Sequence, residues 1–160
     1  TFRDMTAYWP GSAEPFAPPM NEIPKALFSR SGSEGGATTA ALEEALRRRD
    51  AQGLGAPEPP PGAESWAAAR VLRGALAEEI ARLKAEEGKP ILAHGGARFG
   101  QSLVASGLVD EYRLLVHPVA LGSGLPLFSA LDRPLRLRLV STARFACGTV
   151  ANAFVPASAG

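Results

Sequence analysis

A pair of glycines at residues 95 and 96 interrupts two segments that otherwise have the pattern of a protein core. The apolar run "PILA" (90–93) precedes the pair, and "ARFGQSLVASG" follows at once, with Phe99, Leu103 and Val104 on one side. An apolar run without alternation is typical of a strand buried on both faces, whereas apolar residues three and four apart favour a helix. The pair therefore predicts a tight passage from a buried strand to a helix.

Such a junction is where open α/β sheets bind their ligands. Gly95 and Gly96 have no Cβ, so a ligand can approach the main chain closely. The N–H groups of Ala97, Arg98 and Phe99 would point at that ligand, with the positive end of the helix dipole behind them. This pattern favours a phosphate cradle, although a lone glycine pair is more often a plain tight turn.

Other segments extend the alternation of strand and helix. We expect a helix over residues 1–9, helices over 76–87 and 97–106, and Gly107 as the end of the last one. Strands are expected at 25–29, 68–72, 90–94 and 111–119. The segments 135–140 and 148–155 favour a closing antiparallel hairpin. The predicted fold class is α/β, with three layers, a mostly parallel sheet and a C-terminal antiparallel hairpin.

The segment 33–64 differs in character from the rest of the chain. It holds a helical stretch with Leu42 and Leu46 one turn apart, three consecutive arginines and the proline-rich "GLGAPEPPPGAE". We interpret it as a solvated insertion within a single domain that covers residues 1–160.

Composition limits the partners and the compartment. The 17 Lys and Arg residues nearly balance the 16 Asp and Glu residues, which argues against nucleic acid or an anionic membrane as partner. The single cysteine, Cys147, allows no internal disulfide and no metal cluster, and it fits a reducing compartment. No apolar run has the length of a membrane span, and no export signal opens the chain. We expect a cytoplasmic protein without a metal site.

A second strand end carries polar groups. Ser29 and Arg30 follow the expected strand at 25–29, so a hydroxyl and a guanidinium would emerge at the same edge of the sheet as the glycines. Arginine grips phosphate through two charge-assisted hydrogen bonds, and in NADP sites it accommodates the 2′-phosphate. The simpler interpretation is a solvated loop arginine. Thr1, at a helix start, is a third candidate for an anion contact.

Three stretches resemble one known family. They are "NEIPKALFSR", "LAEEIARLKAEEGKPILAHGGARFGQSLVASGLVDEYRLLVHPVALGSGLPLF" and "LRLVSTARFACGTVANAFVP". They are similar to the dihydrofolate reductase-like family, and most of all to the C-terminal reductase domain of the bacterial riboflavin biosynthesis protein. The resemblance covers nearly the whole chain apart from 33–64.

The resemblance implies an NADPH-binding reductase that passes hydride to a pyrimidine- or pteridine-like ring, as 5-amino-6-(5-phosphoribosylamino)uracil reductase does in riboflavin biosynthesis. The alternatives are dihydrofolate reductase activity and a non-catalytic NADP-binding or assembly module. A homodimer is implied as well. The residues that it implies against the cofactor are Thr1, Ser29, Arg30, Gly95, Gly96, Ala97, Arg98 and Phe99. The loop 118–128 would lie near the nicotinamide and the substrate.

The sequence also departs from the family pattern. The family's N-terminal central strand and the Gly-Arg pair before the threonine are absent from these 160 residues. We expect them to belong to a longer polypeptide, because a sheet without its central strand would leave backbone groups unpaired.

No general acid can be named from the sequence. His94 and His117 are interpreted as structural, each with a hydrogen-bonding neighbour. Asp110 and Glu111 are adjacent in a turn, so their side chains point apart, which favours capping or surface ion pairs. Arg136 and Arg138 alternate with a leucine stripe and face solvent or a dimer partner.

Overall fold

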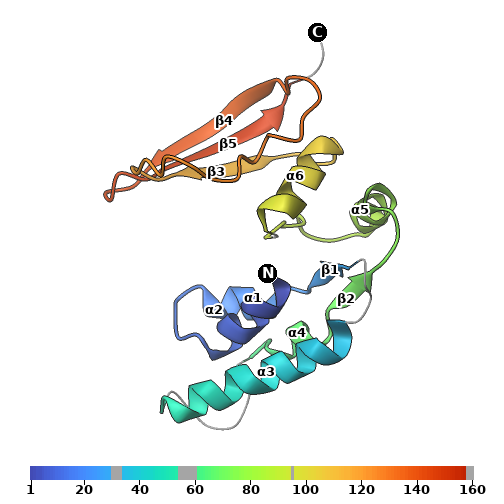
Figure 1. The fold of residues 1–160 in the computed structure, drawn as a ribbon, viewed down its shortest axis with the longest axis vertical. Coiled ribbons are helices and arrows are strands. Elements are labelled where there is room, and N and C mark those ends of the chain that lie inside the picture. The colour runs from blue at the N-terminus through green and yellow to red at the C-terminus, as the bar shows by residue number, and fades with distance from the viewer. Residues whose placement is uncertain (30–33, 54–60, 95, 158–160) are drawn as a thin grey trace. The chain divides into compact units, whose positions relative to one another are not determined.

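The computed structural model describes residues 1–29, 34–53, 61–94 and 96–157. The chain divides into two compact units, Thr1–Lys89 and Pro90–Gly160 (Figure 1). Two residues of the predicted site, Arg30 and Gly95, lie outside the described residues. Among the helices that are described, none has the length and apolar character needed to cross a membrane. The expectation of one domain over 1–160 stays a prediction.

The N-terminal unit combines helices with a short parallel strand pair. The helical elements are α1 (Phe2–Tyr8), the 3-10 turn η1 (Trp9–Gly11), α2 (Ala17–Glu22), α3 (Glu34–Ala51), α4 (Glu64–Ala67) and α5 (Leu76–Ala85). Strand β1 (Ala26–Phe28) pairs in parallel with β2 (Arg70–Leu72), from Ala26↔Arg70 to Phe28↔Leu72. The predicted strands at 25–29 and 68–72, and the helices over 1–9 and 76–87, are thereby confirmed.

The prolines and glycine of the segment "PGSAEPFAPP" (10–19) predict a loop, but helix α2 begins inside this segment, at Ala17. Proline at the first helical positions starts this helix. The first N–H groups of a helix have no intrahelical acceptor, so proline loses nothing there. The loop prediction was wrong from Ala17 onward for that reason.

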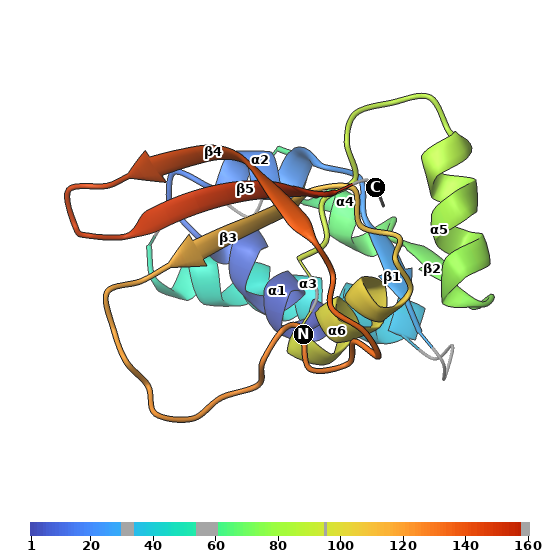
Figure 2. The same cartoon turned by 90° about the horizontal axis from the view of Figure 1, so that it is seen from above.

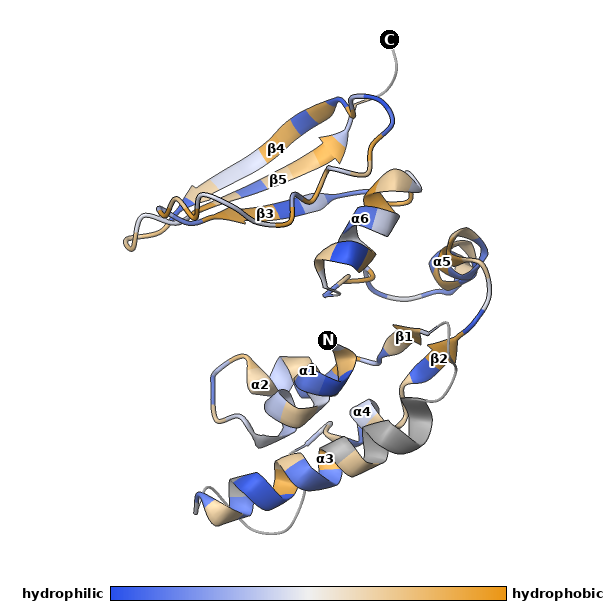
Figure 3. Ribbon diagram, in the orientation of Figure 1, coloured by the Kyte–Doolittle hydropathy of each residue, from blue (hydrophilic) through white to orange (hydrophobic). Residues whose placement is uncertain are grey.

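The core of the N-terminal unit forms around Trp66, which is 1% exposed. Helix α3 runs beside α1 and α4 (Figure 1). It buries Leu42 and Ala45, while much of the rest of α3 that is coloured in Figure 3 is hydrophilic. The helical part of the segment 33–64 is therefore integrated into the core instead of extending into solvent.

A polar network joins α2, α4 and the start of β1. The Trp66 indole Nε1 donates to Asn21 Oδ1 at 2.8 Å. Lys25 Nζ donates to the carbonyls of Met20 and Asn21 at 2.6 and 2.8 Å and to Ser65 Oγ at 2.6 Å. It also lies 4.3 Å from the centre of the Trp66 ring. Lys25 thus caps the end of α2 immediately before β1 begins.

Lys25 gives the N-terminal unit a pH dependence. Burial lowers the pKa of its ammonium to about 8 from the ordinary 10.5, against the smaller opposing effect of the Glu64 carboxylate. Between these values the unfolded chain binds more protons than the folded one, so the Lys25 contribution to stability should rise as the pH increases from about 8 to 10.5. Urea denaturation at several pH values in this range should show the free energy of unfolding rising with pH. In the Lys25→Met variant this rise should be lost. Equal slopes in the two proteins would contradict the prediction.

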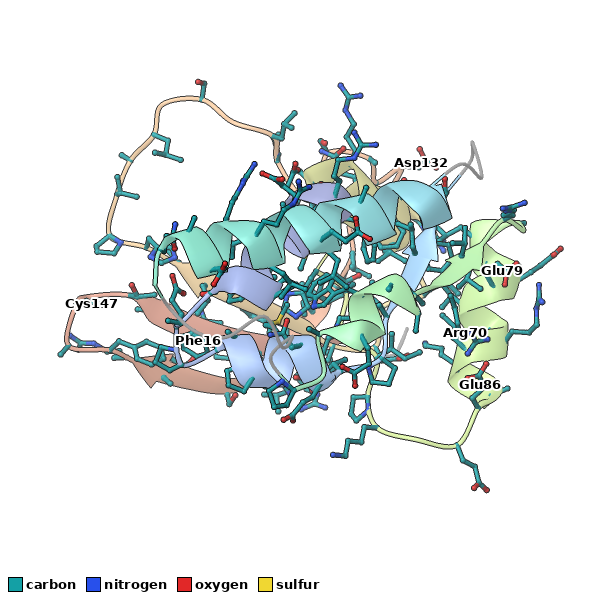
Figure 4. All side chains as sticks on the ribbon, turned by 90° about the horizontal axis from the view of Figure 1, so that it is seen from below. Phe16, Arg70, Glu79, Glu86, Asp132 and Cys147 are labelled. Atoms are coloured by element: carbon teal, nitrogen blue, oxygen red, sulfur yellow. The ribbon has the colours of Figure 1, made fainter. Side chains whose placement is uncertain are left out.

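The turn from β2 to α5 is held by a buried carboxylate. Glu79 is 6% exposed and accepts the Gly74 N–H at 3.0 Å, while Arg82 lies 3.0 Å from the same oxygen. On the solvent side Arg70 and Glu86 form an ion pair of 2.8 Å between β2 and the end of α5 (Figure 4). The hydrogen bond to Arg70 lowers the pKa of Glu86. These contacts orient α5 relative to β2.

The C-terminal unit is one helix with an antiparallel sheet. Its elements are α6 (Ala97–Ala105), β3 (Tyr112–Val116), β4 (Leu137–Arg144) and β5 (Val150–Pro156), and β5 lies between β3 and β4 (Figure 2). The predicted closing hairpin is confirmed, with Gly148 at φ 86° in its turn. Gly107, at φ 67°, ends α6 as expected.

The predicted mostly parallel sheet is only partly found. The α/β class and the antiparallel hairpin are confirmed, but in the described part of the chain β1 and β2 are the parallel pair and the segment 90–94 is no strand. Ile91 and Leu92 are 52% and 54% exposed. A strand needs a neighbour to pair its backbone groups, and no described strand pairs with this segment. Pro90 moreover has no N–H to donate.

Candidate functional site

The N-terminus of α6 presents backbone donors. Gly96 is the N-cap residue, and its carbonyl accepts the Gly100 N–H at 3.0 Å. The N–H groups of Ala97 and Arg98 precede that bond, where a helix supplies no acceptor of its own. The first turn carries no acidic residue, and Gly96 has no side chain with which to cap it. The helix dipole therefore meets no compensating carboxylate from α6.

The side chains around this helix start are compatible with an anion. Ala97 and Arg98 are exposed, whereas Gly96 and Phe99 are half-buried. The Arg98 guanidinium adds a formal positive charge to the partial charge of the helix end. Gly96 has φ −63° and ψ 167°, which any residue can adopt. Glycine is therefore useful at position 96 because it lacks a side chain, and not because the backbone angles require it.

Helix α6 is anchored to the end of the loop 118–128. Leu103 and Val104 are buried, and a Cβ on Gly100 would lie 3.0 Å from Leu127 Cδ1. Gln101 Nε2 donates to the Pro126 carbonyl at 2.8 Å and to Ser129 Oγ at 3.1 Å. The contacts of Gly100 and Gln101 were not predicted from the sequence. A glycine inside an amphipathic helix was the available signal of this close approach.

An aromatic pair also holds the end of the loop 118–128 in place. The rings of Tyr112 and Phe128 are 5.7 Å apart. Tyr112 is 5% exposed, and burial raises its pKa. The first part of the loop is different, since Val119, Leu121 and Leu125 are exposed. The end of the loop is thus fixed against α6 and β3, and its apolar side chains before Pro126 face solvent.

Ser29 lies at the carboxyl end of β1, as predicted. Its N–H donates to the Leu72 carbonyl at 3.2 Å, so it continues the β1–β2 ladder, and it is half-buried. Ser29 belongs to the N-terminal unit and α6 to the C-terminal unit. Their meeting at one cofactor stays a prediction.

Thr1 is the N-cap residue of α1 and makes no capping hydrogen bond with its side chain. Its carbonyl accepts the Met5 N–H at 2.9 Å. Asp4 places a carboxylate in the first turn, where it competes with any external anion for the helix dipole. Contact between Thr1 and a cofactor stays a prediction.

The other candidates have ordinary structural roles in the described residues. His117 Nδ1 lies 3.2 Å from Thr149 Oγ1, which supports its structural interpretation. Cys147 Sγ lies 3.3 Å from the same hydroxyl, and a hydrogen bond from Thr149 to the sulfur lowers the pKa of the thiol. Arg113 pairs with Glu111 on the surface, as the sequence favoured. His94 is exposed. In the described part of the chain no three His, Cys, Asp or Glu residues come together as a metal site would require.

Comparison with known proteins identifies the family. Residues 5–151 match the model of the RibD C-terminal domain. The chain belongs to the RibD C-terminal domain family. This confirms the resemblance drawn from the sequence, and the family is in general one of reductases.

Individual relatives of this RibD C-terminal domain extend the comparison. It is 43% identical over 75 residues to the uncharacterized protein YyaP of Bacillus subtilis (strain 168), across 47% of this chain and 40% of YyaP. It is 43% identical over 65 residues to the uncharacterized protein YwjB of the same organism, across 41% of this chain and 37% of YwjB. The matched segments therefore span less than half of these curated relatives.

One solved structure supports the fold. A crystal structure from Shewanella sp. PV-4, of a protein provisionally assigned to riboflavin biosynthesis, superposes with a TM-score of 0.59 at 19% identity. The match covers 91% of this chain and 64% of the other. At this identity the likeness establishes the shared fold alone.

Proposed function

We propose that this RibD C-terminal domain is an NADPH-dependent reductase of a pyrimidine- or pteridine-like ring, with 5-amino-6-(5-phosphoribosylamino)uracil or a close relative as substrate. The observation that carries the proposal is the acid-free start of α6, from Gly96 to Phe99, in a chain that matches a reductase family over residues 5–151. The provisional assignment of the Shewanella protein to riboflavin biosynthesis supports the choice of pathway.

The residues present fit a dinucleotide phosphate. Gly96 leaves the N–H groups of α6 accessible, and Arg98 offers a cation beside them. A helix start without a neighbouring carboxylate is a ready site for pyrophosphate. Ser29 would contribute a hydroxyl, and Arg30 is assigned by the sequence analysis to the 2′-phosphate.

When bound, NADPH would supply the hydride, and the residues of this chain would bind and orient it. The helix start would hold the pyrophosphate, and the anchored end of the loop 118–128 would limit the position of the ring. Gln101 would act as a positioning residue, because it fixes Pro126 and Ser129 and touches neither the cofactor nor the substrate in this proposal.

Gly96→Asp tests the pyrophosphate site. Aspartate is a favoured N-cap residue, so α6 should be as stable as before or more so. The carboxylate would accept hydrogen bonds from the first N–H groups of α6 and repel phosphate, and we expect a loss of NADPH affinity of about tenfold or more, the effect of about 1.4 kcal/mol. Calorimetric titration with NADPH measures it.

Gly96→Ser is the matched control, because it caps the helix without adding charge. Its loss of affinity should be smaller than that of the aspartate variant, because both side chains cap the helix and only the aspartate adds a negative charge. Equal losses in the serine and aspartate variants would contradict an electrostatic phosphate site. Absence of NADPH binding to the unmodified chain would exclude the proposed cofactor altogether.

Arg30→Ala tests the 2′-phosphate assignment. We expect the affinity for NADPH to fall by about tenfold while that for NADH stays unchanged, because the two differ in the phosphate that the guanidinium would bind. Turnover assays with the ribosylaminopyrimidine and with dihydrofolate separate the two reductase activities. Binding of NADPH without turnover of either would favour the non-catalytic module.

A further inference from the structure

The carboxyl ends of β1 and β2 lie side by side, because the two strands are parallel (Figure 1). Where the pair begins, the Arg70 N–H donates to the carbonyl of Lys25, the residue before its register partner. Where the pair ends, the Ser29 N–H donates to the Leu72 carbonyl in the same way, at 3.2 Å. The register therefore extends by one rung, and Ser29 lies beside Arg73.

This rung places a hydroxyl and a guanidinium on one face of the strand pair. Neighbouring strands are about 4.8 Å apart, and side chains alternate between the two faces along each strand. Arg70 lies three positions before Arg73, so alternation places it on the other face, where it pairs with Glu86 of α5 at 2.8 Å (Figure 4). Ser29 is half-buried and Arg73 is exposed. A ligand at the strand ends can thus meet both groups at once.

The backbone on both sides of Arg73 is held in place. Leu72 belongs to the β1–β2 ladder, and the Gly74 N–H donates to the buried carboxylate of Glu79 at 3.0 Å. A Cβ on Gly74 would collide with the same carboxylate oxygen, so the turn fits closely around a glycine. A backbone that is already ordered lowers the conformational cost of binding a ligand there.

The start of α5 is not the anion site of this turn. Glu78 and Glu79 stand in its first turn, where carboxylates already compensate the helix dipole. Glu79 also pairs with Arg82 at 3.0 Å. An anion at the end of the strand pair would therefore be bound by side chains, on the face that Ser29 and Arg73 share.

We propose that Arg73 binds the 2′-phosphate of NADPH together with the Ser29 hydroxyl, in addition to Arg30. This inference rests on the proposed function of the chain as an NADPH-dependent reductase. Ligands of open α/β sheets bind beyond the carboxyl ends of parallel strands, which is where Ser29 and Arg73 lie. A phosphate offers enough oxygen atoms for a bidentate guanidinium and a hydroxyl. Arg73 would thus contribute to the preference for NADPH over NADH.

Arg73→Ala should reduce the affinity for NADPH by about tenfold or more and leave that for NADH unchanged. Calorimetric titration with the two nucleotides measures the effect, and 2′,5′-ADP serves as a probe of the adenosine end alone. Arg73→Lys should have an intermediate affinity, because lysine keeps the charge but not the two parallel hydrogen bonds.

Arg70→Ala is the matched control. Arg70 is an exposed arginine of the same strand, but it lies on the other face and its partner is Glu86. Loss of an exposed ion pair has little effect on stability. This variant should bind NADPH and NADH as the unmodified chain does, and circular dichroism should confirm that every variant is folded.

A double-mutant cycle tests whether Ser29 and Arg73 hold the same phosphate. Ser29→Ala alone should weaken NADPH binding less than Arg73→Ala does, because it removes one hydrogen bond from an uncharged donor. In the double variant the two losses should not add, since groups that share one partner are coupled. Additive losses would contradict a shared phosphate.

Two results would overturn the assignment of Arg73. They are an unchanged affinity for NADPH in the Arg73→Ala variant, and equal losses for NADPH and NADH, which would place Arg73 away from the 2′-phosphate. If Gly96→Asp weakens NADPH binding and Arg73→Ala does not, the proposed function stands and this inference fails. If the unmodified chain binds neither NADPH nor 2′,5′-ADP, both are wrong.

Discussion

Replacing Gly62 with alanine is expected to unfold much of the N-terminal unit. Gly62 has φ +80°, and an added Cβ would lie 2.8 Å from backbone atoms of Asn21 and Glu22. The left-handed backbone costs alanine about 1 to 2 kcal/mol, and overpacking adds about 1 to 3 kcal/mol. The sum of about 2 to 5 kcal/mol is a large share of the stability of a small unit. Urea denaturation followed by tryptophan fluorescence measures the loss.

Gly53→Ala separates the two causes. Gly53 has a similar φ of +69°, but no atom of the described residues lies within 4 Å of its added Cβ. This variant should lose only the conformational part, about 1 to 2 kcal/mol. Equal losses at Gly62 and Gly53 would show that α2 moves away from the added methyl group at no cost, and would remove the close approach as a determinant of the fold.

Truncation of Trp66 is the second change expected to have a large effect. The side chain is 1% exposed, contacts the Phe2 ring at 5.7 Å, and lies under the Lys25 ammonium. Trp66→Ala leaves a cavity in the middle of the unit and should cost about 3 to 5 kcal/mol. Far-UV circular dichroism in urea is the appropriate measurement, because the variant also removes a fluorophore.

Trp66→Phe distinguishes packing from hydrogen bonding. Phenylalanine keeps an aromatic ring, but it leaves the buried Asn21 Oδ1 without the indole donor that lies at 2.8 Å. An unsatisfied buried acceptor costs about 1 to 3 kcal/mol. Trp9→Phe is the control, because Trp9 is half-buried and its indole donates none of the described hydrogen bonds. This variant should cost less than about 1 kcal/mol. A loss at Trp66→Phe as small as this control would refute the network argument.

The proposed cofactor site could be predicted only in part from the sequence. The glycine pair and the helix after it predicted the α6 start, because backbone donors at a helix N-terminus follow from local geometry alone. The anchoring of α6 by Gln101 and Gly100 to the loop 118–128 was not foreseen. That contact joins residues about 25 positions apart, so no local periodicity of the sequence predicts it.

The sequence by itself determined the elements whose signal is local. Helices α1, α5 and α6 follow from apolar spacing, the end of α6 from Gly107, and the β4–β5 hairpin from alternation around a glycine turn. Such features depend on periods of two and 3.6 residues and on left-handed backbone angles, which neighbouring residues specify without help from distant parts of the chain.

Tertiary structure decided which of these elements are paired and buried. The segment 90–94 has the composition of a strand, yet no described strand pairs with it. Strand pairing depends on a neighbouring strand, which the local sequence does not specify. Leu42 and Ala45 became core residues of a helix that looked solvated, and Lys25 became a cap for α2. Burial and pairing are properties of two surfaces in contact, so a single stretch of sequence specifies only one side of each.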